Sequence, residues 1–128
     1  MNKILVVDDS LTDRTLIRRI LESKNYQVVE TGESHLVAEL VDVEHPDLIL
    51  LDIILPGTNG YEICRDLKSG SKTKKIPIIF VSARKKTSDL YWGKLQGADD
   101  YLTKPVDPAE LLTVVGKFLG QTHNVQKN

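Results

Sequence analysis

The chain of 128 residues has about the length of one domain and is long enough to form a single hydrophobic core. Seventeen Lys and Arg residues oppose eighteen Asp and Glu residues, which gives a formal net charge of -1. This balance argues against a dedicated nucleic-acid binder, which usually carries a basic excess, and against a polybasic membrane-surface protein. The single cysteine, Cys64, excludes an internal disulfide framework and a cysteine-based zinc site.

Neither a secretory signal nor a membrane-spanning stretch is recognisable in the sequence. The first apolar run, Ile4–Val7, ends where Asp8 and Asp9 interrupt it. A signal peptide needs a longer apolar core, and a membrane helix needs about 20 apolar residues. We therefore expect a cytoplasmic protein, and the one thiol fits a reducing compartment.

Five short apolar runs, rich in β-branched residues, predict buried strands. In chain order they are Ile4–Val7, Val28–Val29 with Thr31, Leu48–Leu51, Ile78–Val81 and Tyr101–Leu102. Amphipathic stretches between and after these runs predict five helices. The apolar residues that mark these helices in turn are Leu16, Ile17, Ile20 and Leu21; Leu36, Leu40 and Val43; Ile63 and Leu67; Leu90 and Leu95; and Leu111, Leu112, Val115, Phe118 and Leu119.

Capping residues indicate where several helices begin and end. Ser10, with Asp13 three residues later, predicts the start of the first helix, and Thr87 or Ser88 predicts that of the fourth. Gly97 suits the end of the fourth helix. The signals of the last helix are Asp107 as N-cap, Pro108 at the first helical position, Glu110 in the first turn and Gly120 at the C-cap.

Strands that alternate with helices predict an α/β fold, a single doubly wound five-stranded parallel sheet with helices on both faces. Residues 1–120 are expected to form this one domain, and residues 121–128 a short C-terminal tail. Ligands of such open sheets bind outside the carboxyl ends of the strands, at the point where the strand order reverses. We therefore expect the functional site at this edge of the sheet.

Three carboxylates follow predicted strands directly. Asp8 and Asp9 come after Ile4–Val7, and Asp52 comes after Leu48–Leu51. Negative charges in one crevice repel each other unless a cation neutralises them, and Mg²⁺ binds carboxylate oxygens, waters and phosphate. This pattern predicts a Mg²⁺ site. In the alternative interpretation, each Asp only caps the helix or turn that follows it.

Two further side chains end strands at the same predicted edge. Ser82 follows Ile78–Val81, and Lys104 follows Tyr101–Thr103. Together with a cation, the hydroxyl and the ammonium can hold the oxygens of a phosphoryl group on an aspartate, which can act as a nucleophile and form an aspartyl-phosphate. Each residue alone has an ordinary surface explanation, but their coincidence at one edge predicts phosphoryl chemistry.

The segments that carry these residues resemble the receiver domain of two-component response regulators, the CheY-like family. They are ILVVDDS at 4–10, LILLDIILPGTNGYE at 48–62, IIFVSA at 78–83 and GADDYLTKP at 97–105, and the helix Pro108–Leu119 completes the domain. The joint spacing is specific and covers almost all of the chain. The segment SDLYWGKLQGADDYLTKP also resembles stand-alone receivers of pilus-motility and phototaxis systems, the PilH type.

The resemblance implies a flavodoxin-like (βα)5 fold with strand order 2-1-3-4-5. It implies Asp52 as the phosphoacceptor and Lys104 as the partner of the phosphoryl group. The implied Mg²⁺ ligands are Asp9 and Asp52 directly, Asp8 mainly through water, and the backbone carbonyl of Ile54. The implied switch residues are Ser82 and Tyr101, whose ring moves inward upon phosphorylation, and Pro56 and Gly60 match the loop after the phosphoacceptor.

These assignments imply a stand-alone response regulator rather than an enzyme. A histidine kinase or a phosphotransfer domain is the implied donor, and an output protein is expected to bind at the fourth helix, fifth strand and fifth helix. No output domain is expected after residue 120, and neither nucleic acid nor a membrane is expected as a partner.

Other functions remain open on the residues alone. A Mg²⁺-dependent phosphatase of the haloacid-dehalogenase type needs an acidic residue two positions after Asp52, where this chain has Ile54, which cannot transfer a proton. A phosphate sink or a pseudo-receiver that only binds partners is the second alternative, and the complete set of site residues argues against the pseudo-receiver.

Two side chains have more than one expected position. Arg84, two positions after Ser82, is expected either to cover the phosphoryl group or to reach a nearby carboxylate. Trp92 is expected either at the surface or packed under the fourth helix as part of the core.

Overall fold

The computed structural model describes residues 2–120, and the expected tail 121–128 lies outside the described residues. Its five strands are β1 (Lys3–Val7), β2 (Gln27–Thr31), β3 (Leu48–Leu51), β4 (Ile78–Ser82) and β5 (Asp100–Thr103). Its helices are α1 (Leu11–Glu22), the 3₁₀ helix η1 (Ser34–Leu36), α2 (Val37–Glu44), α3 (Gly60–Ser69), α4 (Thr87–Leu95) and α5 (Pro108–Leu119).

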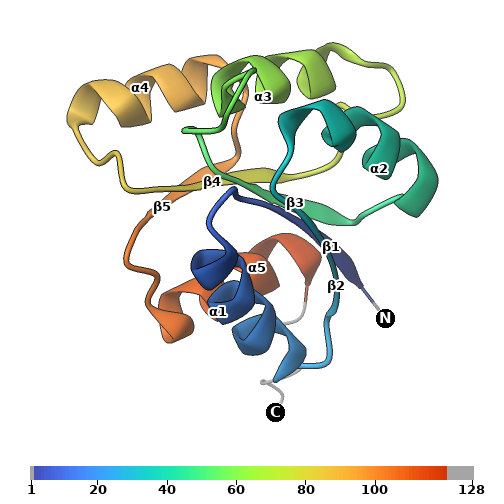
Figure 1. Cartoon of the computed structure of the whole chain (residues 1–128), viewed down its shortest axis with the longest axis vertical. Helices are drawn as coiled ribbons and strands as arrows, with labels where there is room; N and C mark the ends of the chain where they lie inside the picture. The colour runs from blue at the N-terminus through green and yellow to red at the C-terminus, as the bar shows by residue number, and fades with distance from the viewer. Residues whose placement is uncertain (1, 121–128) are drawn as a thin grey trace.

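The strands form one parallel sheet between two layers of helices (Figure 1). The strand order is β2-β1-β3-β4-β5, so the predicted doubly wound sheet and its implied order are confirmed. Helices α1 and α5 cover one face, while α2, α3 and α4 cover the other. The order reverses beside β1, which places the end of β1 next to the end of β3. Among residues 2–120, no helix combines the length and apolar character that crossing a membrane requires.

The core has two parts because successive residues of a strand point to opposite faces of the sheet. In β1, Ile4 and Val6 pack with α1 and α5, whereas Leu5 and Val7 pack with α2 and α3. All strand residues of β3 and β4 are buried. The near-continuous apolar runs of the sequence therefore reflect strands that are covered on both faces.

Most of the predicted helix ends are confirmed by the capping geometry. The Ser10 hydroxyl accepts a hydrogen bond from the N–H of Asp13 at 3.2 Å, and the Asp107 carboxylate accepts one from Glu110 at 2.9 Å. Gly120 has φ 75° at the C-cap of α5. This left-handed conformation favours glycine, as the sequence indicated.

The start of α4 differs from the prediction. The helix begins at Thr87, but neither Thr87 nor Ser88 caps it. Instead, the buried carboxylate of Asp89 reaches back and accepts a hydrogen bond from the N–H of Lys86 at 3.1 Å. An acidic residue in the first turn can satisfy a free backbone donor in this way, which makes a hydroxyl cap unnecessary.

The predicted apolar stripe of α4 is also wrong. Leu90 and Leu95 are 43% and 54% exposed, and the core alternative for Trp92 fails because its side chain is 52% exposed. The reason is Gly93, where an added Cβ would lie 3.1 Å from the Phe80 ring. The helix approaches the sheet through this glycine, which turns its large side chains outward.

Leu16 in α1 and Val43 in α2 are also exposed, although the sequence predicted them as apolar markers of these helices. Val37 and Val41 form the buried side of α2.

Candidate functional site

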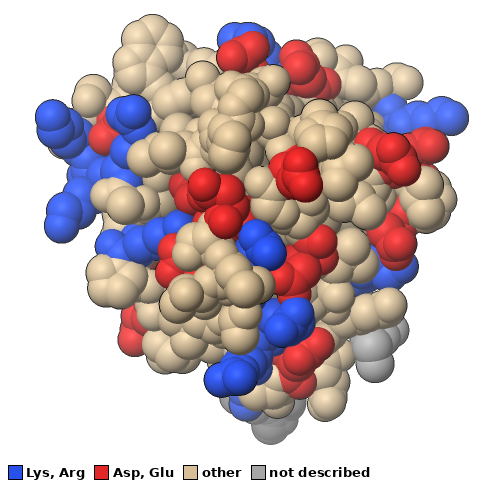
Figure 2. All heavy atoms as spheres, in the orientation of Figure 1, with Lys and Arg blue, Asp and Glu red and all other residues tan. Residues whose placement is uncertain are grey.

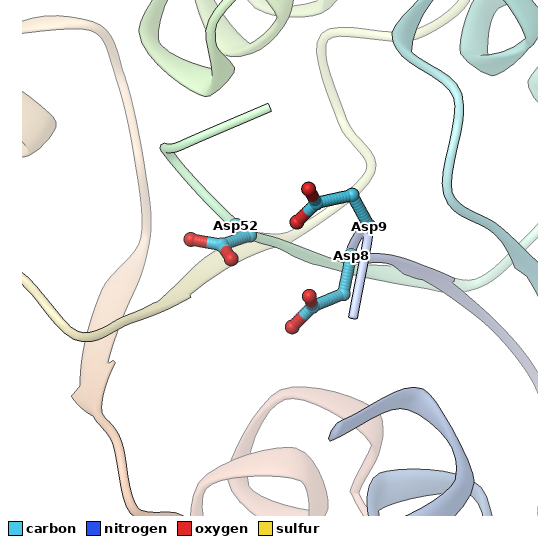
Figure 3. A group of neighbouring side chains, drawn as sticks. All are labelled: Asp8, Asp9 and Asp52. Carbon is cyan, nitrogen blue, oxygen red and sulfur yellow. The ribbon is translucent and has the colours of Figure 1, made fainter. Parts of the chain in front are cut away.

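Three aspartates meet where β1 and β3 end side by side (Figure 3). Asp8 and Asp9 follow β1 and Asp52 follows β3, and carboxylate oxygens of all three lie within 4.8 Å of one another. Asp8 and Asp52 are buried, whereas Asp9 is exposed. The predicted gathering of these carboxylates is therefore present. Figure 2 shows acidic residues clustered near the middle of the face turned toward the viewer, with basic residues beside them.

The environment of Asp8 is suited to binding a cation. Its Oδ1 accepts a hydrogen bond from the Ser10 N–H at 2.9 Å, and its buried Oδ2 forms an ion pair with Lys104 Nζ at 2.7 Å. Burial raises the pKa of Asp8, and contacts with Lys104 and Ser10 oppose this rise. A buried carboxylate requires a cationic partner, and carboxylate oxygens that gather within 4.8 Å of one another are the ligands that a hard divalent cation prefers. The three aspartates therefore fit a Mg²⁺ ligand set.

The backbone around Asp8 is held by α1. Nη1 of Arg14 donates a hydrogen bond to the Asp8 carbonyl at 2.6 Å, and its Nε donates to Glu30 at 2.9 Å. Gly32 leaves room for this guanidinium, because a Cβ there would lie 2.6 Å from Arg14 Nη1. The sequence analysis missed Arg14, since its side chain acts on a backbone atom and no motif identifies such a contact.

Lys104 stands among carboxylates. Its Nζ donates hydrogen bonds to Asp52 Oδ2 at 3.0 Å and to Asp13 Oδ2 at 2.9 Å, and it lies 2.7 Å from Asp8 Oδ2 as an ion pair. Burial by itself lowers the pKa of Lys104, but its close contacts with the carboxylates of Asp13, Asp8 and Asp52 outweigh burial and raise this pKa above its usual value. The ammonium is therefore charged at neutral pH and lies beside Asp52.

Asp13 is a second residue at the site that the sequence analysis did not identify. It was interpreted only as a residue of the first turn of α1, and the structure also places its carboxylate on Lys104. The available signal was topological: α1 begins at the sheet edge where β1 ends, so an acidic side chain in its first turn lies within reach of the site.

The two predicted switch residues are linked through one backbone segment. Ser82 is fully buried at the end of β4, where its Oγ accepts a hydrogen bond from the Arg84 N–H at 3.2 Å. The Tyr101 hydroxyl donates to the Arg84 carbonyl at 2.6 Å, and its ring lies beside Phe80 with 6.0 Å between centroids. Burial raises the pKa of Tyr101 to about 12, so the hydroxyl remains a donor at neutral pH. The backbone of Arg84 therefore connects both side chains.

The Arg84 side chain reaches a carboxylate, which was one of its two expected positions. Its Nη1 lies 3.3 Å from Asp89 Oδ1 in α4. The Arg84 side chain is 51% exposed, so the ion pair contributes little stability. Its effect is to tie the β4–α4 segment to the first turn of α4.

The loop after β3 is shaped closely around Asp52. The Ile54 N–H donates to Asp52 Oδ1 at 3.3 Å, and the Ile54 side chain is 53% exposed. A Cβ on Gly60 would lie 2.3 Å from the Asp52 carbonyl, so only glycine fits there. The Pro56 carbonyl accepts a hydrogen bond from Ser34 at 3.0 Å. These contacts fix the loop that presents the Asp52 carboxylate.

Comparisons with known proteins agree with this geometry. Residues 4–116 match the profile of the response regulator receiver domain. The chain is 40% identical over 119 residues to the protein PilH of Pseudomonas aeruginosa, a match that covers 93% of this chain and 98% of PilH. It is also 40% identical over 119 residues to the phosphate regulon regulator PhoB of the same organism, of which it spans 52%. The BeF3-activated receiver domain of Klebsiella pneumoniae RstA has a TM-score of 0.86 at 34% identity, covering 92% of this chain and 98% of that one.

Proposed function

The chain belongs to the response regulator receiver family, and from this premise we propose that it is a Mg²⁺-dependent phosphorylation switch with Asp52 as the phosphoacceptor. Receiver domains are signalling switches rather than conventional enzymes, and a histidine kinase or a phosphotransfer domain is the proposed donor. The observation that carries the proposal is the position of Lys104 Nζ, 3.0 Å from Asp52 Oδ2 and beside the three-aspartate cluster.

The proposed reaction is a transfer between two nucleophiles. A carboxylate oxygen of Asp52 attacks the phosphorus of a phosphohistidine, and the bond from phosphorus to the imidazole nitrogen breaks with its electron pair remaining on that nitrogen. Lys104 donates to a phosphoryl oxygen, and the Ser82 hydroxyl donates to another. Positioning and charge neutralisation are the main contributions of these side chains.

The proposed Mg²⁺ ligands come from the residues that gather at the strand ends. Asp9 and Asp52 are assigned as direct ligands, with Asp8 acting mainly through water and Ile54 through its backbone carbonyl. When bound, the ion neutralises negative charge on the phosphoryl oxygens. The gathering of three carboxylate oxygens, of Asp8, Asp9 and Asp52, within 4.8 Å of one another supports a cation at this position.

The proposed switch runs from Ser82 to Tyr101. A phosphoryl group on Asp52 would attract the Ser82 hydroxyl, whose Oγ accepts from the Arg84 N–H. Movement of this backbone would shift the position of the Arg84 carbonyl, which accepts a hydrogen bond from the Tyr101 hydroxyl. Phosphorylation would thereby shift the populations of two conformations of the β4–α4 segment and of Tyr101.

The proposed output surface is the face formed by α4, β5 and α5, and its partner is proposed to be a protein. Four large apolar side chains of α4 are exposed there, namely Leu90, Tyr91, Trp92 and Leu95. Exposed apolar residues that gather on one helix are typical of protein interaction sites. The near-neutral charge of the chain disfavours nucleic acid and anionic membranes as partners.

The phosphatase alternative is the weaker proposal. A phosphatase with an aspartate nucleophile requires a nearby group that transfers a proton to the leaving group. Ile54, two residues after Asp52, has an exposed apolar side chain. It contributes no proton, so the aspartyl-phosphate is expected to persist as a signal.

Binding of beryllofluoride, which mimics a phosphoryl group on aspartate, tests the proposal. We expect Mg²⁺-dependent binding that shifts the NMR signals of Ser82, Arg84 and Tyr101. The Asp52→Asn variant should not bind, whereas Asp66→Asn, a charge change at an exposed position of α3, should bind as the wild type does. Absence of Mg²⁺-dependent binding by the wild type would overturn the proposed function.

A further inference from the structure

Asp13 is the third carboxylate on Lys104, and it lies outside the three-aspartate cluster. It occupies the third position of α1, where its backbone N–H is capped by Ser10. Its Oδ2 accepts a hydrogen bond from Lys104 Nζ at 2.9 Å, and its side chain is 38% exposed. The contact joins the first turn of α1 to the residue that follows β5.

The surroundings of Lys104 leave its ammonium little freedom. An ammonium has three N–H donors. Two of them are used by Asp13 and Asp52, and Asp8 Oδ2 lies 2.7 Å from the same Nζ. A phosphoryl oxygen that enters the site must therefore compete with carboxylates that already hold the lysine.

The three carboxylates differ in what else they can do. In the proposed function, on which this inference rests, Asp52 carries the phosphoryl group and Asp8 turns toward the cation. Both are thereby withdrawn from Lys104 when the site is loaded. Asp13 has no such second role and stays beside Lys104.

We propose that Asp13 is a positioning residue that competes with the phosphoryl group for Lys104 and so weakens the phosphorylated form of the site. In the unphosphorylated protein, Asp13 holds the ammonium toward α1. Upon phosphorylation, the Lys104 ammonium has to move N–H donors from Asp13 to the phosphoryl oxygens. The strength of the Asp13–Lys104 contact then sets how tightly the site retains a phosphoryl group.

A double-mutant cycle with beryllofluoride tests this proposal. The dissociation constant of beryllofluoride is measured by NMR at saturating Mg²⁺ for the wild type, Asp13→Asn, Lys104→Met and the double variant. We expect Asp13→Asn to bind more tightly than the wild type by up to about fivefold, the upper limit for a partly exposed ion pair. In the Lys104→Met background, the same substitution should change the affinity by much less.

A matched control separates this effect from a general change of charge. Glu110 occupies the third position of α5, and within residues 2–120 it forms no ion pair. Glu110→Gln removes the same charge from the start of another helix at this edge and should leave the affinity unchanged. A structural defect would weaken binding, so a gain in affinity cannot come from lost structure.

The outcomes distinguish the inference from the function on which it rests. If the wild type binds no beryllofluoride, the proposed function fails. If the wild type binds but Asp13→Asn binds equally or more weakly, the role of Asp13 is wrong and the function stands. An equal gain in the Lys104→Met background would show that Asp13 acts through its charge alone, which also overturns competition for Lys104.

Discussion

Lys104 Nζ hydrogen-bonds to Asp52 Oδ2 at 3.0 Å, although 52 positions separate the two residues in the chain. The sheet explains the contact. Thr103 is paired with Ser82, and the Lys104 N–H donates to the Ser82 carbonyl at 2.9 Å. These contacts fix the position of the Lys104 backbone relative to the end of β4. From there its side chain reaches past the end of β4 to the end of β3. A cation is thereby placed where an aspartyl-phosphate would need one.

Removing this cation should reduce stability. In Lys104→Met, three carboxylates lose their shared partner, and we expect the free energy of unfolding at pH 7 without metal to fall by about 2–4 kcal/mol. The pKa of Lys104 is raised, so its contribution is fully present below pH 10.5 and is lost as the pH rises through the raised value. Urea denaturation with a chelator measures the change.

Mg²⁺ provides the complementary measurement on the same variant. The cation should recover more stability in Lys104→Met than in the wild type, because it neutralises carboxylates that no longer have the ammonium. If Lys104→Met and the wild type are equally stable without metal and gain the same stability from Mg²⁺, Lys104 does not balance the charges of the site.

Ile54 is expected to prolong the phosphorylated state. Its exposed side chain follows two positions after the phosphoacceptor and has no donor or acceptor that could orient an attacking water. Ile54→Asn should therefore shorten the half-life of the isolated phosphoprotein by roughly tenfold or more. Thr58→Ala, at an exposed position of the same loop, is the control. Equal half-lives in wild type and Ile54→Asn would show that this position does not control water access.

Gly60 is expected to be required for the shape of the site. A Cβ there would lie 2.3 Å from the Asp52 carbonyl and 2.8 Å from Ile53 Cα, and neither backbone atom can move without displacing the phosphoacceptor. We expect Gly60→Ala to lower stability by about 2 kcal/mol or more and to slow phosphorylation. At Gly70 the nearest atom is the side-chain hydroxyl of Thr73, which can turn away, so Gly70→Ala should be milder. Equal effects of the two substitutions would contradict this account.

The sequence predicted the sheet and most of the site because both follow from local patterns. Apolar runs that end in Asp8 or Asp52 identify strands and the edge where their side chains meet. The α4 surface was predicted wrongly, because Gly93 rather than a leucine stripe makes the contact with Phe80. The partnership of Asp13 with Lys104 joins residues 91 positions apart, and its side-chain geometry follows only from how α1 and β5 are placed.

Cys64 is expected to be unreactive in the folded protein. Burial raises the pKa of its thiol to about 11, and the Sγ donates weakly to the Gln96 carbonyl at 3.4 Å. The thiolate fraction at pH 8 should then be roughly 100-fold below that of a free cysteine, with burial slowing attack further. Thiol labelling at pH 8, with and without urea, measures the ratio.

The raised pKa of Cys64 also makes the stability of the protein depend on pH. The unfolded chain releases the Cys64 proton near pH 9, whereas the folded protein keeps it to about pH 11. The folded state therefore binds the proton more tightly, so this group lowers stability progressively as the pH rises from 9 to 11. Replacing Cys64 with alanine should make stability less dependent on pH across this range. Rapid labelling of the native thiol would show that its environment is open.

The most direct test of the central claim is phosphorylation of the intact protein. Wild type and Asp52→Asn are incubated with acetyl phosphate and Mg²⁺, and their masses are followed with time. We predict that the wild type gains one phosphoryl group, that a chelator prevents the gain, and that Asp52→Asn stays unmodified. Labelling of Asp52→Asn at the rate of the wild type would contradict the assignment of Asp52 as the phosphoacceptor.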